Sequence, residues 1–304
     1  MHLRSVARPT GVTLGRDGAM AVLNIAELKP EPWDIGRPVH GYAWRSPKAN
    51  ASVLLQHGFA EYAERYVAHY SQLIPRLVEA GFDVYAFDLR GHGQSPGARG
   101  VVDVWEAVAD HQAARARLAL EQKPTFLFGH SLGGLVTAAS VVQTQANVAG
   151  VVLSAPALPG NVPVVVGLAF GLFASIASAL RIGPAMDPNV LSCVPAEVEA
   201  YANDPRINDA RISMKLVSTA MNAGHAIEKK YTNWTVPTLI VHGEMDRAAD
   251  PTGSKRLFHQ IKAADKRLEL YPQGRHELLN DLDRNAVLEV VLTWLSSPQR
   301  LPAR

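Results

Sequence analysis

The sequence predicts an α/β protein whose mainly parallel, doubly wound sheet carries one inserted helical segment. Short apolar runs alternate with helical patterns of about 10 to 20 residues, which is typical of a parallel sheet with helices on both faces. The alternation is interrupted between residues 158 and 234, where no strand pattern occurs. With 304 residues, 47% of them hydrophobic and 19% charged, the chain is long and apolar enough to bury a large core.

Each predicted strand is a short apolar run bounded by turn residues, and the first two runs are predicted to pair. In chain order the runs are AMAVLNIAEL (19–28), VHGYAW (39–44), SVLLQHG (52–58), FDVYAFD (82–88), TFLFGH (125–130), VAGVVLSAP (148–156), VPTLIVHG (236–243) and RLELYP (267–272). Helical patterns fill the intervals. They cover residues 63–80, which Gly81 closes, 104–122, 131–143 and 286–295.

The interrupted region predicts a helical cap over residues 158–234, inserted between core segments 19–157 and 235–304. Its start, the run from Val162 to Leu180, holds no charged residue or histidine. This run is long enough to meet the threshold for a membrane-spanning helix. Glycines and serines weaken its hydropathy, and a span here would put the two halves of one sheet on opposite sides of a membrane. Two alternatives stay open: a buried cap helix, or a cap helix that lines an acyl pocket or rests on a lipid surface.

Charge and cysteine content narrow the partners and the location. Thirty basic and 28 acidic residues leave a net charge of +2 without a long basic run, so nucleic acid is not an expected partner. Cys193 is the only cysteine, which excludes an internal disulfide and a cysteine-rich metal site. The N-terminal stretch lacks the apolar core of a signal peptide, so we expect a cytoplasmic location. We expect neither a metal nor a cofactor.

The stretch FGHSLGG (128–134) places Ser131 between Gly129 and Gly133, directly after an apolar run and before a helical one. A serine at the tip of a sharp strand-to-helix turn needs such neighbours, because its backbone is strained and the strand and helix pass close together. The pattern predicts a nucleophile elbow, with Ser131 as the candidate nucleophile.

A serine nucleophile needs a base and a carboxylate, which on such a scaffold follow it in the order acid, then histidine. Asp246 comes just after the run that ends at Gly243, and His276 follows the last predicted strand, so both lie where ligands bind in open α/β sheets. Asp250 is a rival for the acid, but its place before Pro251 predicts a helix N-cap.

Other histidines are weaker candidates for the base. His130 adjoins the serine, and we expect its side chain to point away from it. Five others lie on strand, helix or terminal positions without a link to the elbow: His2, His40, His69, His111 and His259. His225 lies in the cap and could at most contact the substrate.

The negative oxygen of an acyl-transfer intermediate needs hydrogen-bond donors. One is expected from the backbone N–H of Leu132, at the N-terminus of the elbow helix, where the helix dipole also favours negative charge. The other is expected from the N–H of Phe59, in the loop after the strand that leads into His57 and Gly58.

The stretch DLRGHGQS (88–95) holds several polar side chains that suggest a second site. A glycine-rich loop held by an internal pair of Asp88 and Arg90 is the structural alternative, and we favour it.

Several stretches together resemble a known family: HGFAEYAERY, DLRGHGQSPGARG, GHSLGG, LSAPAL, YANDP and YPQGRHE. They are similar to the bacterial and mammalian monoacylglycerol lipases of the α/β-hydrolase superfamily, close to the lysophospholipases, over about Val39 to Leu295. The resemblance implies an α/β-hydrolase fold, an acyl-enzyme mechanism and a lipid ester as substrate. It also implies a triad of Ser131, Asp246 and His276 with oxyanion donors at Phe59 and Leu132.

The chain departs from this family at three positions. The family usually has glycine, histidine and methionine where this chain has Ala60, Tyr62 and Leu132. Backbone donors survive such changes, so the departures leave the hydrolytic mechanism intact and put the substrate in doubt. A lysophospholipase, a general esterase, an amide hydrolase or perhydrolase, and a non-catalytic receptor on the same scaffold stay open, because fold does not decide function.

Overall fold

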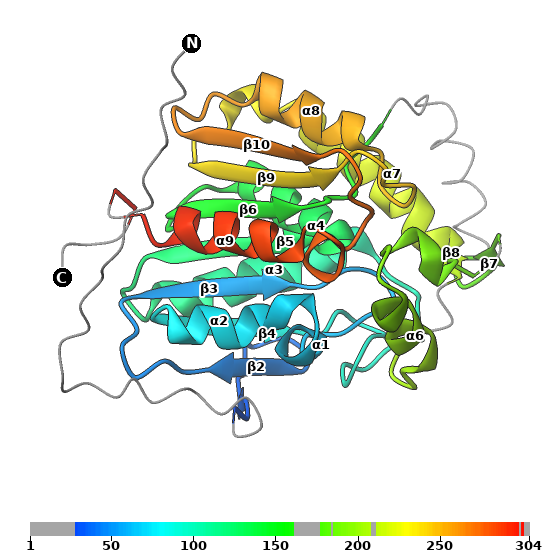
Figure 1. The fold of residues 1–304 in the computed structure, drawn as a ribbon, viewed down its shortest axis with the longest axis horizontal. Coiled ribbons are helices and arrows are strands. Elements are labelled where there is room, and N and C mark those ends of the chain that lie inside the picture. The colour runs from blue at the N-terminus through cyan, green and yellow to red at the C-terminus, as the bar shows by residue number, and fades with distance from the viewer. Residues whose placement is uncertain (1–27, 161–176, 184, 208–210, 298, 301–304) are drawn as a thin grey trace, which may run out of the picture.

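A single large sheet organises the protein in the computed structural model, which describes residues 28–160, 177–183, 185–207, 211–297 and 299–300 (Figure 1). Its strands are β1 Glu31–Pro32, β2 Gly41–Trp44, β3 Ala51–Gln56, β4 Phe82–Phe87, β5 Thr125–His130, β6 Gly150–Ser154, β9 Thr238–Gly243 and β10 Lys266–Tyr271. They are ordered β1-β2-β4-β3-β5-β6-β9-β10, with β2 antiparallel to β1 and β4 and all other neighbours parallel. The predicted mainly parallel sheet is therefore confirmed, while 19–27 of the first predicted strand lies outside the described residues.

Helices cover both faces of the sheet, as the alternation predicted. They are α1 Arg65–Ala68, α2 Leu73–Glu79, α3 Val104–Ala119, α4 Ser131–Gln143, α8 Pro251–Gln260 and α9 Arg284–Leu295. In Figure 1, α1, α2 and α9 lie on the near face and α3 and α4 on the far face. Alternate strand residues separate the two cores: Leu54 packs on the far side with α3 and α4, and Val53 and Leu55 pack on the near side with α2 and α9. All three side chains are fully buried.

The prediction of one continuous helix over residues 63–80 is wrong. It is broken into α1, the 3₁₀ turn η2 Tyr70–Gln72 and α2, with positive φ at Tyr70, Ser71 and Gln72. Two bonds from far along the chain hold the break: the Tyr70 N–H donates to Asn280, and the Ser71 hydroxyl donates to the Leu279 carbonyl. Pro75 then sits in the first turn of α2, where its missing N–H costs nothing.

The chain between β6 and β9 contains more than helices. It forms β7 Arg181–Ile182, the turn η3 Pro188–Val190, α6 Pro195–Asn203, β8 Ile212–Ser213, α7 Met214–Glu228 and the turn η4 Tyr231–Asn233. The expectation of no strand here is wrong, because β7 and β8 pair antiparallel, but two residues are too few to give a periodic signal. These elements lie largely beyond the carboxyl ends of the sheet strands, and α7 reaches back to pack on α3 and α4 (Figure 1).

Most of the uncharged run from Val162 to Leu180 lies outside the described residues, including the cap helix predicted there. Within the described part of the chain, no helix combines the length and the apolar character needed to cross a membrane.

Strand register brings the loops of interest together at one edge. Gln56 at the end of β3 pairs with Gly129 of β5, so the His57-Gly58 turn emerges beside Ser131. Gly243 of β9 pairs with Tyr271 of β10, so the loops that follow both strands start at one level. The parallel arrangement therefore places residues more than a hundred positions apart in one cluster.

Candidate active site

Ser131 occupies a strained backbone position between β5 and α4. Its φ of 51° lies in the left-handed region, which non-glycine residues rarely adopt. Close packing requires both elbow glycines: a Cβ on Gly129 would lie 2.5 Å from the Thr137 hydroxyl oxygen, and one on Gly133 would lie 2.2 Å from the Gln56 carbonyl oxygen. The predicted nucleophile elbow is thus present in its geometry.

Three side chains predicted from the sequence are joined by hydrogen bonds. His276 Nε2 lies 2.8 Å from Ser131 Oγ, and His276 Nδ1 lies 2.7 Å from Asp246 Oδ2. Asp246 follows β9 and His276 follows β10, and they are 8% and 3% exposed. This is the arrangement in which a histidine can accept the serine proton while a carboxylate orients it.

Asp246 is saturated with hydrogen bonds. Its Oδ1 accepts the backbone N–H groups of Ala248 and Ala249 at 2.8 and 2.9 Å, and its Oδ2 faces ring nitrogens of His276 and His242 at 2.7 and 3.1 Å. Burial by itself would raise the pKa of this carboxyl, but the two histidines outweigh burial and hold the pKa well below its usual range. Asp246 is therefore ionised at neutral pH.

The pKa of His276 is shifted upward from its ordinary value. Burial disfavours the charged ring and so lowers the pKa of His276. The Asp246 carboxylate raises this pKa through its charge and its hydrogen bond, and the charges of Glu277 and Glu61 raise it further. The net result raises the pKa of His276, which strengthens it as a proton acceptor.

The predicted oxyanion donors belong to two segments that adjoin Ser131, the turn after β3 and the first turn of α4. A Cβ on Gly58 would lie only 3.1 Å from Ser131 Cβ, so the turn that presents Phe59 passes directly over the serine. The Phe59 N–H has no hydrogen-bond partner among the described residues, and the Leu132 N–H lies in the first turn of α4, where helix N–H groups lack an internal acceptor. Within the described residues, both N–H groups therefore lack an internal acceptor, and their role as oxyanion donors stays a prediction.

A buried carboxylate that the sequence did not single out supports this turn. Glu61 accepts the Gly58 N–H at 2.6 Å, the hydroxyls of Tyr66 and Tyr70 at 2.9 Å each, and Arg65 at 3.3 Å. Glu61 and Arg65 belong to the stretch HGFAEYAERY, so the resemblance carried a signal for them.

Arg65 links Glu61 to the loop after β10 that carries His276, called the histidine loop below. Its guanidinium binds both carboxylate oxygens of Glu277 at 2.8 and 3.2 Å, and Glu277 directly follows His276 in the chain. Burial would raise the pKa of Glu277, but Arg65 overrides it and lowers that pKa to about 2. The Glu277 N–H also donates to the Leu191 carbonyl at 2.8 Å, which ties the histidine loop to the segment between β6 and β9.

The His130 ring lies beside the candidate base: its centroid is 4.9 Å from that of His276. That the side chain points away from Ser131 stays a prediction. His130 Nδ1 lies 3.1 Å from the carbonyl oxygen of its β6 register partner, Ser154, which holds the ring at this edge of the sheet. Burial first, and the neighbouring His276 second, lower the pKa of His130 to about 4, so it is neutral at neutral pH.

The prediction of an ion pair between Asp88 and Arg90 within this loop is wrong. Arg90 instead binds Asp110 of α3 at 2.8 and 3.0 Å. Asp88 is held by three other donors, Tyr42 OH, Ala63 N–H and Gln94 N–H. A Cβ on Gly93 would lie 2.1 Å from Asp88 Oδ2, so the loop closes tightly around this carboxylate and has the structural role that we favoured.

Asp250 has the capping role that its sequence context predicted. It is the N-cap of α8, and its carboxylate accepts the Thr252 N–H at 2.9 Å. Of the two aspartates, Asp246 contacts His276 and Asp250 caps α8.

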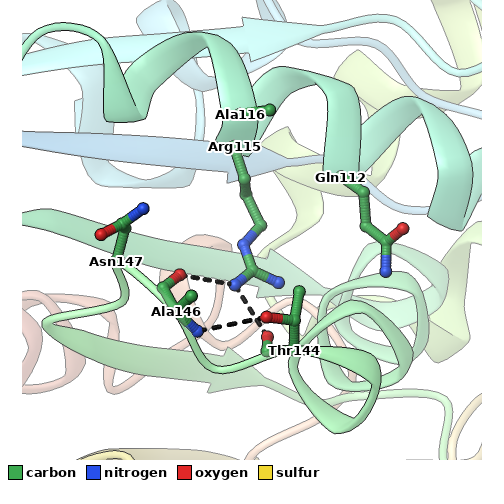
Figure 2. Close-up of a pocket in the computed structure, with 6 residues that line it drawn as sticks. All are labelled: Gln112, Arg115, Ala116, Thr144, Ala146 and Asn147. Atoms are coloured by element: carbon green, nitrogen blue, oxygen red, sulfur yellow. Dashed lines mark hydrogen bonds between the residues drawn. The ribbon is translucent and has the colours of Figure 1, made fainter.

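A cavity of about 170 Å³ lies apart from the triad, between α3 and the turn after α4 (Figure 2). It is lined by Gln112, Arg115, Ala116, Thr144, Ala146 and Asn147. Arg115 donates there to backbone carbonyls, which ties the turn to α3.

In the described part of the chain, no group of three or more His, Cys, Asp or Glu side chains is arranged to hold a metal ion.

Comparison with known proteins agrees with this geometry. The family model described as serine aminopeptidase, S33, matches residues 47–283. The chain belongs to this hydrolase family. Monoacylglycerol lipase of Mycolicibacterium smegmatis is 32% identical over 252 residues, 81% of this chain and 88% of the relative. Human monoglyceride lipase is 31% identical over 264 residues, 83% of each. The crystal structure of Paleococcus ferrophilus monoacylglycerol lipase matches with a TM-score of 0.76 at 32% identity, covering 86% of this chain and 99% of that one. The predicted α/β-hydrolase fold and the resemblance to monoacylglycerol lipases are confirmed.

Proposed function

We propose that this protein is a serine carboxylester hydrolase that releases a fatty acid and glycerol from monoacylglycerols. The observation that carries the proposal is the unbroken hydrogen-bond chain from Ser131 through His276 to Asp246, with distances of 2.8 and 2.7 Å, at a strained elbow. The substrate class is supported by the two lipase relatives of at least 31% identity. Lysophospholipase or general esterase activity is the alternative.

The reaction follows from the geometry in two halves. His276 Nε2 takes the proton of Ser131, whose oxygen attacks the ester carbonyl carbon, and the negative oxygen that develops is bound by the N–H groups of Phe59 and Leu132. The intermediate collapses when His276 gives its proton to the departing alcohol oxygen, which leaves an acyl group on Ser131. Water then repeats the sequence and releases the fatty acid. No cofactor takes part in this scheme.

The segment at residues 158–234 is proposed as a cap over the site, with 19–157 and 235–304 as the core. This is supported by its insertion between β6 and β9 and by the position of its described elements beyond the carboxyl ends of the strands (Figure 1). The uncharged run from Val162 to Leu180 suits contact with an acyl chain or a lipid surface. Peripheral membrane contact and a cytoplasmic location stay predictions.

A substrate panel tests the function. Turnover of mono-, di- and triacylglycerols, lysophospholipids, simple esters and an aminoacyl amide is compared for the wild type and Ser131→Ala, together with stoichiometric labelling by a fluorophosphonate. We expect medium- and long-chain monoacylglycerols to be preferred over acetyl esters and triacylglycerols, with labelling that depends on Ser131. Labelling without turnover of any ester would favour a receptor, and preferred cleavage of a lysophospholipid or an amide would replace the proposed substrate class.

A further inference from the structure

A second histidine contacts the carboxylate of the triad. His242 lies in β9, four residues before Asp246, and is fully buried. Its Nε2 lies 3.1 Å from Asp246 Oδ2 and 3.1 Å from the Ala249 carbonyl oxygen, and its Nδ1 lies 2.7 Å from the hydroxyl of Ser254 in α8. His242 takes no part in the reaction scheme above, and no sequence motif pointed to a role for it.

The partners determine which ring nitrogen carries hydrogen. The Ala249 carbonyl and the ionised Asp246 carboxylate are both acceptors, so Nε2 must carry a proton and donate it between them. Ser254 can act as donor or acceptor, so its hydroxyl suits Nδ1 with or without a proton. The contacts therefore place a proton on Nε2, where it is donated to Asp246.

We propose that His242 is a positioning residue for the catalytic acid, holding Asp246 Oδ2 in place and moderating its pull on the proton of His276. This inference rests on the proposed function. Oδ2 accepts from two imidazoles, with His276 at 2.7 Å and His242 at 3.1 Å, while Oδ1 is occupied by backbone N–H groups. The carboxylate therefore cannot rotate without breaking bonds at both oxygens.

The same contact adjusts the electrostatics of the base. A donor on Oδ2 withdraws part of the negative charge that stabilises protonated His276, so loss of this donor favours the protonated ring. The other titratable groups that act on His276 and Asp246 are Glu61 before α1, Glu277 directly after His276 and His130 at the end of β5, while Arg65 of α1 acts through Glu277. All four stay in place when only His242 is changed.

A matched pair of variants separates the donor from the bulk of the side chain. In His242→Gln the amide N–H reaches roughly the Nε2 position and keeps a donor for Asp246. In His242→Asn the amide reaches only the Nδ1 position, so it keeps a partner for Ser254 and loses the one for Asp246. His111→Asn is the control for shortening a buried histidine, because His111 is also fully buried, on α3, and touches no triad residue.

The readouts are kcat, KM and the pH profile of kcat/KM with a soluble ester, together with the thermal midpoint of each variant. For His242→Asn we expect kcat to fall about tenfold with KM unchanged, since a hydrogen bond to a charged group is lost. Its acid limb should move to higher pH, whereas His242→Gln and His111→Asn should keep the wild-type limb. A folded His242→Asn with the wild-type limb and kcat, or a folded His242→Gln that behaves like it, would overturn the proposal.

A further measurement is made on the wild-type protein, and a variant serves only to assign the signals. Long-range ¹H–¹⁵N NMR spectra report which nitrogen of each histidine is protonated, and His242 is assigned by the loss of its signals in His242→Gln. We expect His242 Nε2 to carry a proton, and a bare Nε2 would refute the role. If the wild type hydrolyses no ester, the proposed function fails, while the tautomer still tests the contact by itself.

Discussion

Replacing Asp246 by asparagine tests the proposed triad most directly, because the surrounding bonds dictate how the new side chain must lie. The backbone N–H groups of Ala248 and Ala249 donate to Oδ1 at 2.8 and 2.9 Å, so the amide oxygen has to occupy that position. The amide NH₂ then takes the place of Oδ2, 2.7 Å from His276 Nδ1. Two donors cannot face each other there.

The conflict with His276 is relieved when this histidine changes tautomer, while His242 Nε2 keeps the Ala249 carbonyl as its acceptor. His276 Nδ1 then accepts from the asparagine, and its Nε2 carries the proton and donates to Ser131, so it can no longer take the serine proton. We expect kcat to fall about 10⁴-fold, equivalent to about 5.4 kcal/mol of transition-state stabilisation. The loss should appear in kcat, because neither His276 nor Asp246 is needed to bind the ester.

Asp250→Asn is the matched control in the same loop. Asp250 caps α8 through the Thr252 N–H, and asparagine caps helices about as well as aspartate, so kcat should stay within about twofold of the wild type. Both variants are assayed on a soluble ester at a pH above the acid limb, with circular dichroism as the folding check. Equal damage from the two substitutions, or a folded Asp246→Asn that keeps more than about 1% of wild-type kcat, would refute the choice of acid.

Four further outcomes are expected. The acid limb of kcat/KM should have its midpoint above the ordinary histidine value of about 6.5, because the pKa of His276 is raised and only the neutral ring accepts a proton; a midpoint below that value contradicts this. Glu61→Gln should lower kcat about tenfold with little change in KM, since it weakens the bond that holds Gly58 beside the oxyanion site; unchanged kinetics in a folded variant would show that the turn holds itself. The pKa of Glu277 is lowered to about 2, so its ionised form contributes stability that is fully present above about pH 4.5 and is lost as pH falls through the folded value. That contribution is of the order of 3 kcal/mol, and urea unfolding of Glu277→Gln should show a weaker loss of stability between those pH values than the wild type does. EDTA should leave activity unchanged, and a loss that added metal restores would contradict the scheme without a metal.

Much of the scaffold could be predicted because its signals are local. The inner strands β3, β5 and β9 are mostly apolar runs, since a parallel strand with neighbours on both sides is covered on both faces of the sheet and its side chains are buried. The elbow was predictable for a similar reason, because only glycines fit where β5 and α4 approach each other beside Ser131. Chain order then located Asp246 and His276.

Features held by distant contacts could not be predicted. The break between α1 and α2 depends on Asn280 and Leu279, some 210 residues away, and nothing within residues 63–80 records those bonds. Arg90 has a carboxylate two residues away in the chain, yet its side chain binds Asp110 on α3. Proximity in sequence was a poor guide because the buried Asp110 carboxylate on α3 lies within reach of Arg90 once the helix packs against its loop.

The sequence by itself determined the type of fold and the residues that form the candidate triad, because each depends on a strand, a turn or chain order. Only the tertiary structure decided how those groups are tuned: His242 on Asp246, His130 against His276, and the Glu61–Arg65–Glu277 cluster that holds the Gly58 N–H. The physical reason is that pKa shifts and side-chain orientation come from burial and contact across strands. Those contacts exist only once the carboxyl ends of the parallel strands meet at one edge of the sheet.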